Sequence, residues 1–252
     1  MNIVNFSGGK DSTALILLMR EKGIKIDRVN CADTGVEFPG IEENIMQVKE
    51  LLERDGVEFN LIKPERSFEE SACQVTVNSP QYGERTGYGF PSWKMRWCNR
   101  VLKASLLKKF EHDSDGVVFV GIAADERERA ERKYLQKGNF RLLLVEENMT
   151  EKDCLEYCYK SGFRFGGFYE RYHRGGCWCC PLQRNDELYR LYKEYPELFQ
   201  KLVEMQKVIK KNTEFCNKGT HYPLWAFGGR KGGDDLVRWV ESYELKQAQK
   251  KK

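Results

Sequence analysis

Residues 7–12, with the sequence SGGKDS, have the composition of a phosphate-binding loop. They lie between a short apolar run at residues 2–6 and a segment with helical periodicity at residues 11–22. Gly8 and Gly9 allow backbone N–H groups to turn toward an anion, and the N-terminus of the following helix adds partial positive charge. The pattern fits neither G-x-x-x-x-G-K-[ST] nor G-x-G-x-x-G, so it excludes the ordinary P-loop and the dinucleotide-binding loop.

The polar side chains of this loop are suited to binding a phosphate group. Lys10 supplies a positive charge, and the hydroxyl groups of Ser7 and Ser12 supply hydrogen-bond donors. Asp11 falls in the first turn of the predicted helix, where an acidic side chain is favourable. The alternative is an ordinary strand–turn–helix junction, but the complete SGGKDS sequence after the first strand favours phosphate binding.

Two further predicted strands are followed by acidic residues. Asp33 follows the strand expected at residues 28–32, and Asp125 and Glu126 follow the one expected at residues 117–122. Because α/β sheets place ligand-binding groups at the carboxyl ends of their strands, we expect Asp33 at such a site. Asp125 and Glu126 are predicted to bind Mg²⁺ or a ribose.

Three arginines, Arg127, Arg129 and Arg132, accompany this second acidic pair. Their guanidinium groups are suited to an anionic phosphate or sulfate. A solvated helical face of alternating charge is the alternative for residues 125–133. The strand that precedes them favours a functional interpretation.

Four cysteines have the pattern of a metal site. Cys177 and Cys180 form a C-x-x-C pair in the sequence GCWCCP, and Cys179 adds a third thiol. A short turn aims both sulfurs of such a pair at one metal, which suits zinc or an iron–sulfur cluster. Cys98, at the start of a predicted helix, is the best candidate for a distant ligand, with Cys216 in reserve. Thiolates alone do not select between the two metals.

Basic and aromatic residues are concentrated around these cysteines. Residues 84–109 and residues 159–185 each contain several lysines or arginines against a single glutamate, with aromatic side chains between them. Arg96, Arg100 and Arg174 are close enough in sequence to offset the charge of thiolates. Aromatic stacking combined with positive charge also suits a nucleotide or a single-stranded nucleic acid. For any one of these residues, core packing or a solvated surface position is the simpler interpretation.

The chain contains nine cysteines, and the remaining ones receive structural interpretations. Cys154 and Cys158 are four residues apart on a predicted helix and are expected to face the core. Cys31 is expected in the core of a strand, and Cys73 is left undecided. Because no secretory signal is apparent, metal binding or redox chemistry is favoured over a disulfide framework.

The overall charge argues against a generally basic nucleic-acid-binding protein. The 252 residues include 42 lysines and arginines against 38 aspartates and glutamates. Residues 246–252, KQAQKKK, carry four of the lysines, which leaves 38 against 38 in the rest. No apolar run approaches the ~18 residues of a membrane span. We therefore expect a cytoplasmic protein that does not enter a membrane.

The order of the predicted elements positions these groups on an α/β fold. The expected strands are residues 2–6, 28–32, 57–62, 117–122 and 140–145, with helices between them at residues 11–22, 41–54 and 99–110. This alternation predicts a doubly wound, mostly parallel sheet with helices on both faces. Residues 64–95 lack a clear period and are expected to form a long functional loop.

The C-terminal part is expected to be helical and to carry the cysteines. Thr150, with Asp153 three residues later, predicts a helix start, and two further helices are expected at residues 186–211 and 234–247. We expect a nucleotide-binding domain at residues 1–160 and a helical region at 161–245 packed on it. Residues 246–252 are expected to be a disordered basic tail.

The sequence resembles the phosphoadenosine phosphosulfate reductase family of the adenine nucleotide α-hydrolase-like proteins over about residues 1–185. SGGKDS resembles the pyrophosphate-binding loop of that superfamily, which is the most specific of the motifs. CADTGVEFP at residues 31–39 resembles its D-T-G-x-E-F-P stretch, and GIAADERER at residues 121–129 its glycine–acid–arginine segment. NMTEKD at residues 148–153 resembles its usual helix start. The motifs occur in the order found in the family.

The resemblance implies an enzyme that binds ATP and Mg²⁺, cleaves ATP between the α and β phosphates and activates a substrate as its adenylate. Together with the patterns above, it predicts catalytic roles for Lys10, Ser12, Asp125, Glu126 and Arg129. Nucleotide contacts are predicted for Ser7, Gly8, Gly9, Lys10, Asp11, Ser12, Asp33, Thr34 and Gly121.

The resemblance also bears on the metal. In this branch a cysteine at the place of Cys98 joins a later C-x-x-C to hold a [4Fe–4S] cluster. Sulfonucleotide reductases have a cysteine pair at the first place, whereas this chain has Cys98-Asn99. The single cysteine and the later G-C-W-x-C look more like the sulfur-transfer enzymes of DNA phosphorothioation. We expect Cys98, Cys177 and Cys180 to converge with Cys179 as fourth ligand on a [4Fe–4S] cluster, with zinc as the alternative.

Three functions follow from these patterns. The first is an adenylylating enzyme of sulfur transfer, with a nucleotide or nucleic-acid acceptor and a sulfur donor protein as partner. The second is a sulfonucleotide reductase, which looks to need a C-terminal Glu-Cys-Gly-Leu-His segment that this sequence lacks. The third is a zinc-stapled nucleic-acid-binding module. The complete SGGKDS loop favours the first.

Overall fold

The computed structural model describes residues 1–79, 83–92, 95–111, 116–173, 175–180, 182–214 and 235–250. The chain divides into two compact units, of which the first comprises Met1–Pro64 and Val101–Gly176. The second comprises Glu65–Arg100 and Cys177–Lys252. This division differs from the expected boundary after residue 160, because the 3₁₀ turn η2 (Phe165–Gly167) packs against helix α2 (Pro39–Arg54) of the first unit.

The first unit is built on a five-stranded sheet in the order β3-β2-β1-β6-β7. Each neighbouring pair of strands is parallel. The strands are β1 (Asn2–Phe6), β2 (Arg28–Ala32), β3 (Glu58–Ile62), β6 (Val117–Val120) and β7 (Phe140–Arg141). The predicted parallel α/β fold is therefore confirmed.

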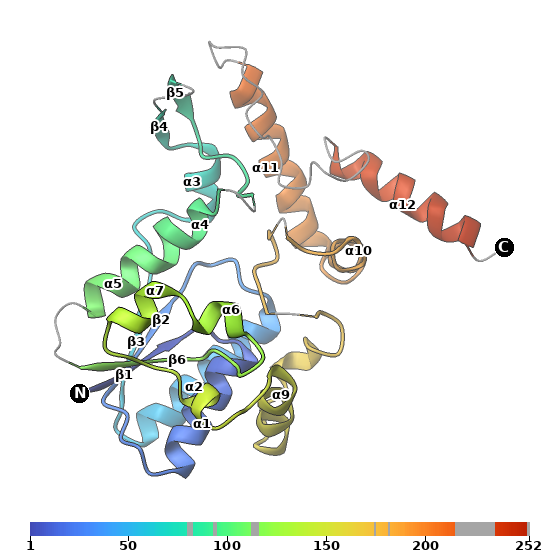
Figure 1. Cartoon of the computed structure of the whole chain (residues 1–252). Helices are drawn as coiled ribbons and strands as arrows, with labels where there is room; N and C mark the ends of the chain where they lie inside the picture. The colour runs from blue at the N-terminus through green and yellow to red at the C-terminus, as the bar shows by residue number, and fades with distance from the viewer. Residues whose placement is uncertain are drawn as a thin grey trace. The chain divides into compact units, whose positions relative to one another are not determined.

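Helices cover both faces of this sheet. α1 (Lys10–Glu21) and α2 lie on one face, and α5 (Ser105–Glu111) lies on the other (Figure 1). α9 (Glu151–Lys160) packs beside α1. The strand order changes direction between β1 and β6, so the chain leaves these two neighbouring strands toward opposite faces. Such a switch point opens a crevice at the carboxyl ends of the strands, where ligands bind in α/β proteins.

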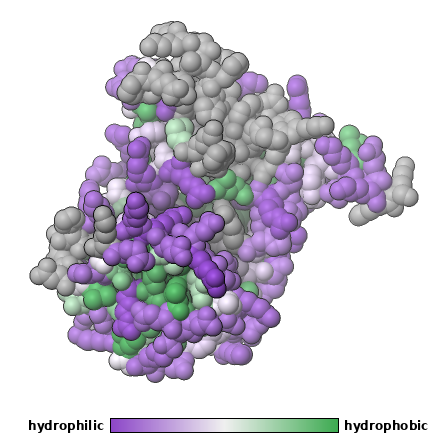
Figure 2. Space-filling model, viewed as in Figure 1, coloured by the Kyte–Doolittle hydropathy of each residue, from purple (hydrophilic) through white to green (hydrophobic). Residues whose placement is uncertain are grey.

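The core of this unit is formed by the sheet and by α1. Ile3 and Val4 on β1 and Val29 on β2 are fully buried, as are Ala14 and Leu15 on α1. Burying a valine, leucine or isoleucine side chain contributes about 1.5–3 kcal/mol to the stability of the fold. The packing of β1 against α1 therefore fixes both ends of the loop that connects them. The described surface shown in Figure 2 is largely hydrophilic, in keeping with a chain of which 32% is charged.

The predicted start of α9 is confirmed, whereas the last predicted strand is partly wrong. The Thr150 hydroxyl accepts a hydrogen bond from the Asp153 N–H at 3.2 Å, and the Asp153 carboxylate accepts one from the Thr150 N–H at 2.9 Å. Residues 140–145 form only the two-residue β7, and the chain then turns into α8 (Leu143–Glu146). One helical turn buries Leu143 and Leu144 together, which an alternating strand face cannot do. α6 (Arg127–Ala130) and α7 (Lys133–Lys137) are the remaining short helices described in this unit.

The second unit contains structure where a long loop was expected. Residues 64–95 include α3 (Phe68–Cys73) and an antiparallel hairpin of β4 (Thr76–Ser79) and β5 (Gly83–Thr86). The missed signal is a capping box: Ser67 accepts a hydrogen bond from the Glu70 N–H, and Glu70 accepts one from the Ser67 N–H. After this segment comes α4 (Trp97–Asn99), and the π-helical stretch η1 (Arg100–Ala104) then leads from the second unit into the first.

The expected helical C-terminal part is confirmed, with two changes of boundary. Instead of one helix at residues 186–211 there are two, α10 (Asn185–Glu194) and α11 (Pro196–Glu214). They separate because a residue before proline is disfavoured in the helical region, and Tyr195 has φ −134°. α12 (Leu236–Lys250) runs through residues expected to form a disordered tail, since lysine, glutamine and alanine are all good helix formers.

Candidate active site

The SGGKDS loop connects β1 to α1 at the carboxyl edge of the sheet. Gly8 has a left-handed backbone with φ +76°, and a Cβ there would lie 2.6 Å from Ile45 Cγ1, so the position accepts only glycine. The Asn44 side-chain amide donates to Gly8 O at 2.9 Å and to Thr13 Oγ1 at 2.9 Å. α2, which carries Ile45 and Asn44, therefore fixes the path of the loop.

Ser12 stabilises the loop from within. Its hydroxyl donates to Gly9 O at 3.0 Å and accepts from the Ser7 N–H at 3.2 Å. Only 3% of Ser12 is exposed, whereas Ser7 lines the neighbouring cavity. Ser7 therefore lines the cavity, whereas the Ser12 hydroxyl shapes the loop.

Lys10 is buried and is held by two carboxylates. Its Nζ lies 2.8 Å from Asp11 Oδ1 and 2.7 Å from Glu151 Oε2 at the start of α9. Burial by itself lowers the pKa of Lys10, but the charges of Asp11 and Glu151 outweigh burial and raise the pKa above its ordinary value. Burial raises the pKa of Asp11 despite the attraction of Lys10. The ammonium group is therefore charged at neutral pH, and the two carboxylates compete with any bound anion for it.

Gly121, which follows β6, brings a second strand end against the loop. A Cβ at this position would lie 2.8 Å from both the Cα and the N of Ser12. These are backbone atoms of the first turn of α1, so they cannot move aside easily. The glycine lets the ends of β1 and β6 meet at the switch point of the sheet.

A cavity of about 360 Å³ opens over the loop. It has the size of a ligand pocket. Its lining includes loop residues, the strand end after β6 and the start of α9: Ser7, Gly9, Lys10, Asp11, Glu37, Ile41, Lys103, Gly121, Glu126, Arg129, Glu151, Tyr169, Gly175 and Gly176.

One wall of this cavity carries a buried carboxylate, Glu37. It accepts hydrogen bonds from Thr34 Oγ1 at 2.7 Å and Lys103 Nζ at 3.0 Å. Burial acts to raise the pKa of Glu37, but the charge of Lys103 and the hydroxyl of Thr34 outweigh burial and hold the pKa below its ordinary value. Thr34, predicted to contact the nucleotide, has its hydroxyl occupied by Glu37.

The predicted metal cysteines all belong to the second compact unit. Cys179 is buried, and Cys98, Cys177 and Cys180 are half-buried. Within the described ranges, no three or more histidine, cysteine, aspartate or glutamate side chains are gathered so that they could hold a metal ion. The shared site of the four thiols stays a prediction from the sequence.

The other cysteines with structural interpretations are buried in the structure. Cys31, Cys154 and Cys158 are each 0% exposed. Burial raises the pKa of Cys31 and Cys154 to about 12 and raises that of Cys158 as well. Two groups named in the sequence analysis, Cys216 and Arg174, lie outside the described residues.

Residues 1–183 match the family model of the phosphoadenosine phosphosulfate reductase domain. The chain belongs to the phosphoadenosine phosphosulfate reductase domain family. The matched region includes the SGGKDS loop, all strands of the five-stranded sheet and the GCWCC sequence. The family resemblance stated from the sequence is thereby confirmed.

Two curated proteins are similar in sequence to most of this chain. Both are uncharacterized proteins of Methanocaldococcus jannaschii. MJ0066 is 28% identical over 227 residues, which are 86% of this chain and 43% of that protein. MJ0973 is 28% identical over 214 residues, which are 81% of this chain and 47% of that protein. The chain thus spans a little under half the length of these relatives.

Among solved structures, this chain is similar to the U34-tRNA thiolase NcsA from Methanococcus maripaludis with its [4Fe–4S] cluster. The TM-score is 0.45 at 14% sequence identity. The similarity covers 87% of this chain and 73% of that chain.

The acidic residues of the family motifs occupy different positions relative to the cavity. Glu126 lines it and binds Arg129, whose Nη1 lies 2.8 Å from Glu126 Oε1. Asp125 accepts a hydrogen bond from the Glu151 N–H at 2.9 Å, so it caps the start of α9. Asp33 accepts one from the Gly35 N–H at 3.1 Å and is not among the described residues that line the cavity.

Four charged or aromatic residues of the cavity wall have no individual role predicted from the sequence: Glu37, Lys103, Glu151 and Tyr169. Glu37 and Glu151 lie inside family motifs, and their place in these motifs could have identified them as candidate site residues. Lys103 and Tyr169 lie in the two basic, aromatic segments, from which Gly175 and Gly176 also reach the cavity.

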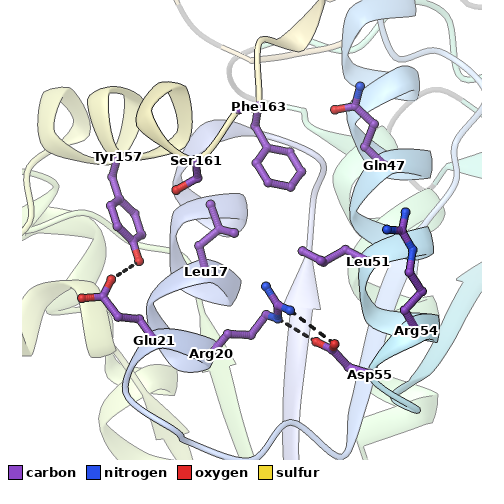
Figure 3. A pocket seen from close by; sticks show the side chains of 11 residues that line it. Leu17, Arg20, Glu21, Gln47, Leu51, Arg54, Asp55, Tyr157, Ser161 and Phe163 are labelled. Atoms are coloured by element: carbon purple, nitrogen blue, oxygen red, sulfur yellow. Dashed lines mark hydrogen bonds and ion pairs between the residues drawn. The ribbon is translucent and has the colours of Figure 1, made fainter.

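A larger cavity of about 830 Å³ lies at the C-terminal end of α1 (Figure 3). Leu17 and Phe163 project into it, and Arg20 pairs with Asp55 at 2.7 Å across one side. Because none of the family motifs contributes to its lining, whereas several of them line the smaller cavity, we take the smaller cavity as the candidate active site. Along the part of the chain that the structure describes, no helix has the length and apolarity to cross a membrane.

Proposed function

We propose that this chain binds ATP with Mg²⁺ at residues 7–12, transfers the adenylyl group to an acceptor and releases pyrophosphate. The observation that carries this proposal is the position of Lys10. A buried, charged ammonium lies at the N-terminus of α1, where the backbone and the helix dipole also favour an anion. The pyrophosphate end of ATP fits this combination.

The charges of the cavity support a requirement for Mg²⁺. Its described lining carries four carboxylates, Asp11, Glu37, Glu126 and Glu151, against three cations, Lys10, Lys103 and Arg129. Each cation is already paired with one of these carboxylates at 3.0 Å or less. A bare polyphosphate would meet a lining with a net charge of about −1, whereas a polyphosphate that arrives with Mg²⁺ brings the missing positive charge.

In the proposed reaction an acceptor oxygen attacks the α-phosphorus of ATP. The bond between the α-phosphorus and the bridging oxygen breaks, and pyrophosphate leaves with that oxygen and the electron pair. Lys10 and the N–H groups at the start of α1 would stabilise the charge that develops on pyrophosphate. Arg129, which also lines the cavity, is the second cation suited to the phosphates.

Sulfur transfer would follow at the activated acceptor. A sulfide-level nucleophile from a sulfur donor protein forms a bond to the acceptor atom, and AMP leaves with the oxygen. No change of oxidation state is needed in this step. A nucleotide or nucleic acid is the acceptor that we favour, because the segments carrying Lys103 and Tyr169 are basic and aromatic.

The four cysteines form the second part of the proposal. Cys98, Cys177, Cys179 and Cys180 are the thiols proposed for a [4Fe–4S] cluster, with zinc as the alternative metal. Their membership of one compact unit and the thiol-only donor set support this assignment. Because the described residues gather no metal-binding group, no step of the proposed reaction is assigned to the cluster.

The experiment that tests the proposal is an assay of ATP cleavage with Mg²⁺ and candidate acceptors. AMP and pyrophosphate are the expected products, and release of ADP and phosphate would assign the chain to another reaction class. Replacing Lys10 with alanine removes a charge-assisted contact of about 1.5–3 kcal/mol, so ATP binding should weaken about 10- to 150-fold. Lys22→Ala is the control, because Lys22 pairs with Glu147 at 2.8 Å away from the cavity. Unchanged ATP affinity in Lys10→Ala would refute the assignment.

A further inference from the structure

Tyr169 meets the phosphate loop from a distant part of the chain. Its hydroxyl oxygen accepts a hydrogen bond from the Lys10 N–H at 2.9 Å, although the two residues are 159 positions apart. Lys10 is the first residue of α1, and the first N–H groups of a helix have no acceptor within the helix. Tyr169 therefore takes up a donor that would otherwise point directly at an anion.

The position of this hydroxyl is closely determined by its surroundings. The Tyr169 ring packs edge-on against Phe165 and Phe168, with ring centroids 4.9 Å and 5.2 Å away. A Cβ at Gly175 would lie 2.8 Å from the hydroxyl oxygen, and one at Gly9 would lie 3.2 Å from it. Two glycines thus leave the space that the phenol occupies between the loop and residues 175–176.

The hydrogen-bonding capacity of Tyr169 is only partly used. A phenol has one hydrogen to donate and lone pairs to accept, and the Lys10 N–H occupies a lone pair. Among the described residues, the Lys10 N–H is the one hydrogen-bond partner of this hydroxyl that the structure contains. Burial raises the pKa of Tyr169, so the hydrogen stays on the oxygen at neutral pH. That hydrogen remains available to an acceptor in the cavity that Tyr169 lines.

We propose that Tyr169 is a positioning residue that passes the hydrogen bond from the first N–H of α1 on to a phosphate oxygen. This inference rests on the proposed function, because it deepens the binding of the pyrophosphate end of ATP. An N–H that donates to the phenol oxygen polarises the O–H bond and makes it a better donor. The helix N-terminus thereby reaches farther into the cavity than its own backbone allows, without adding a charge beside Lys10.

The test compares ligand binding by the wild-type chain and by Tyr169→Phe, which keeps the ring and removes the hydroxyl. Calorimetric titrations use ATP with Mg²⁺, pyrophosphate with Mg²⁺, and adenosine, which has no phosphate. We expect Tyr169→Phe to weaken ATP and pyrophosphate binding about 10-fold and to leave adenosine binding unchanged. A role in folding alone would weaken all three ligands together. Tyr159→Phe is the matched control, since its hydroxyl donates to Glu170 at 2.8 Å and does not line the cavity.

The outcomes separate this inference from the function on which it rests. Equal or tighter binding of both phosphate ligands by Tyr169→Phe would overturn the role of Tyr169 and leave the ATP site intact. Failure of the wild-type chain to bind any of the three ligands would overturn the proposed function itself. If Tyr169→Phe does not fold, Gly175→Ala provides the second variant, because its Cβ would displace the hydroxyl. The same selective loss of phosphate ligands is expected, and its absence would overturn the inference.

Discussion

Replacing Glu151 with glutamine tests whether Lys10 is held ready for a phosphate or serves only to tie α1 to α9. Glu151 Oε2 lies 2.7 Å from Lys10 Nζ, but 45% of the Glu151 side chain is exposed. Solvent therefore screens the attraction, and we assign about 1 kcal/mol to the pair, the upper end of the range for exposed ion pairs. When a polyphosphate is bound, Glu151 competes with it for the same ammonium group. Removing that charge should therefore tighten pyrophosphate binding about 5-fold.

The assay is a calorimetric titration with pyrophosphate in the presence of a chelator, at low and at moderate salt. The gain in affinity should shrink as salt rises, because screening weakens the competing charge. Glu147→Gln is the matched control, since it also removes a carboxylate paired with a lysine at 2.8 Å, but away from the cavity. If Glu151→Gln binds pyrophosphate as the wild-type chain does or more weakly, Glu151 acts as a support for Lys10 and the competition argument is refuted.

Three further results are expected. Gly121→Ala should lower the free energy of unfolding by about 1–3 kcal/mol in urea titrations, since its Cβ would meet the backbone of α1 at 2.8 Å; unchanged stability would contradict the close approach. Glu37→Gln should also be less stable at neutral pH, by about 1–3 kcal/mol. The folded-state pKa of Glu37 lies below its ordinary value of 4.5, so the stability difference between wild type and Glu37→Gln should reach its full size above about pH 4.5. The difference should disappear as the pH falls further and Glu37 becomes protonated. A stability difference that does not change with pH would argue against a charged Glu37. Cys98→Ser and Cys177→Ser should each abolish iron and acid-labile sulfide in anaerobically purified protein, with Cys154→Ala as control; a wild-type chain with zinc and no iron would reject the cluster.

Most of the first unit was predictable because its elements carry local signals. The apolar runs of β1, β2 and β6 and the period of α1 and α2 each lie within a dozen or so residues, and their alternation leaves few topologies. The failures occurred where two signals compete over a short span. Residues 140–145 are apolar enough for a strand, yet burying Leu143 and Leu144 on one side needs a helical turn. In the second unit, a six-residue helix such as α3 is too short to show a period, and only its cap reveals it.

The candidate site was predictable to the extent that it is local in sequence. The loop, with Gly8, Gly9 and Lys10, could be identified because its function depends on adjacent backbone groups. Tyr169 could not, because its contact with the Lys10 N–H depends on the packing of residues 159 positions apart. The same holds for Lys103, which reaches Glu37 from a segment 66 residues away. The spacing of residues in the sequence reveals which side chains are neighbours on one helix or strand. The contacts of Tyr169 with Lys10 and of Lys103 with Glu37 instead depend on how distant elements pack together.

The family motifs contain residues that face the cavity and residues that hold those in place. Thr34 lies in a motif, yet its hydroxyl is used to orient Glu37, which in turn binds Lys103. Asp125 likewise caps the helix whose first residue, Glu151, binds Lys10. Thr34 binds the carboxylate of Glu37 directly, whereas Asp125 binds the backbone N–H of Glu151. In each case the glutamate carboxylate then pairs with a lysine of the cavity. A substitution at Thr34 or Asp125 would therefore act on a ligand through the position of a lysine. Motif membership alone does not distinguish such residues from those that touch the ligand.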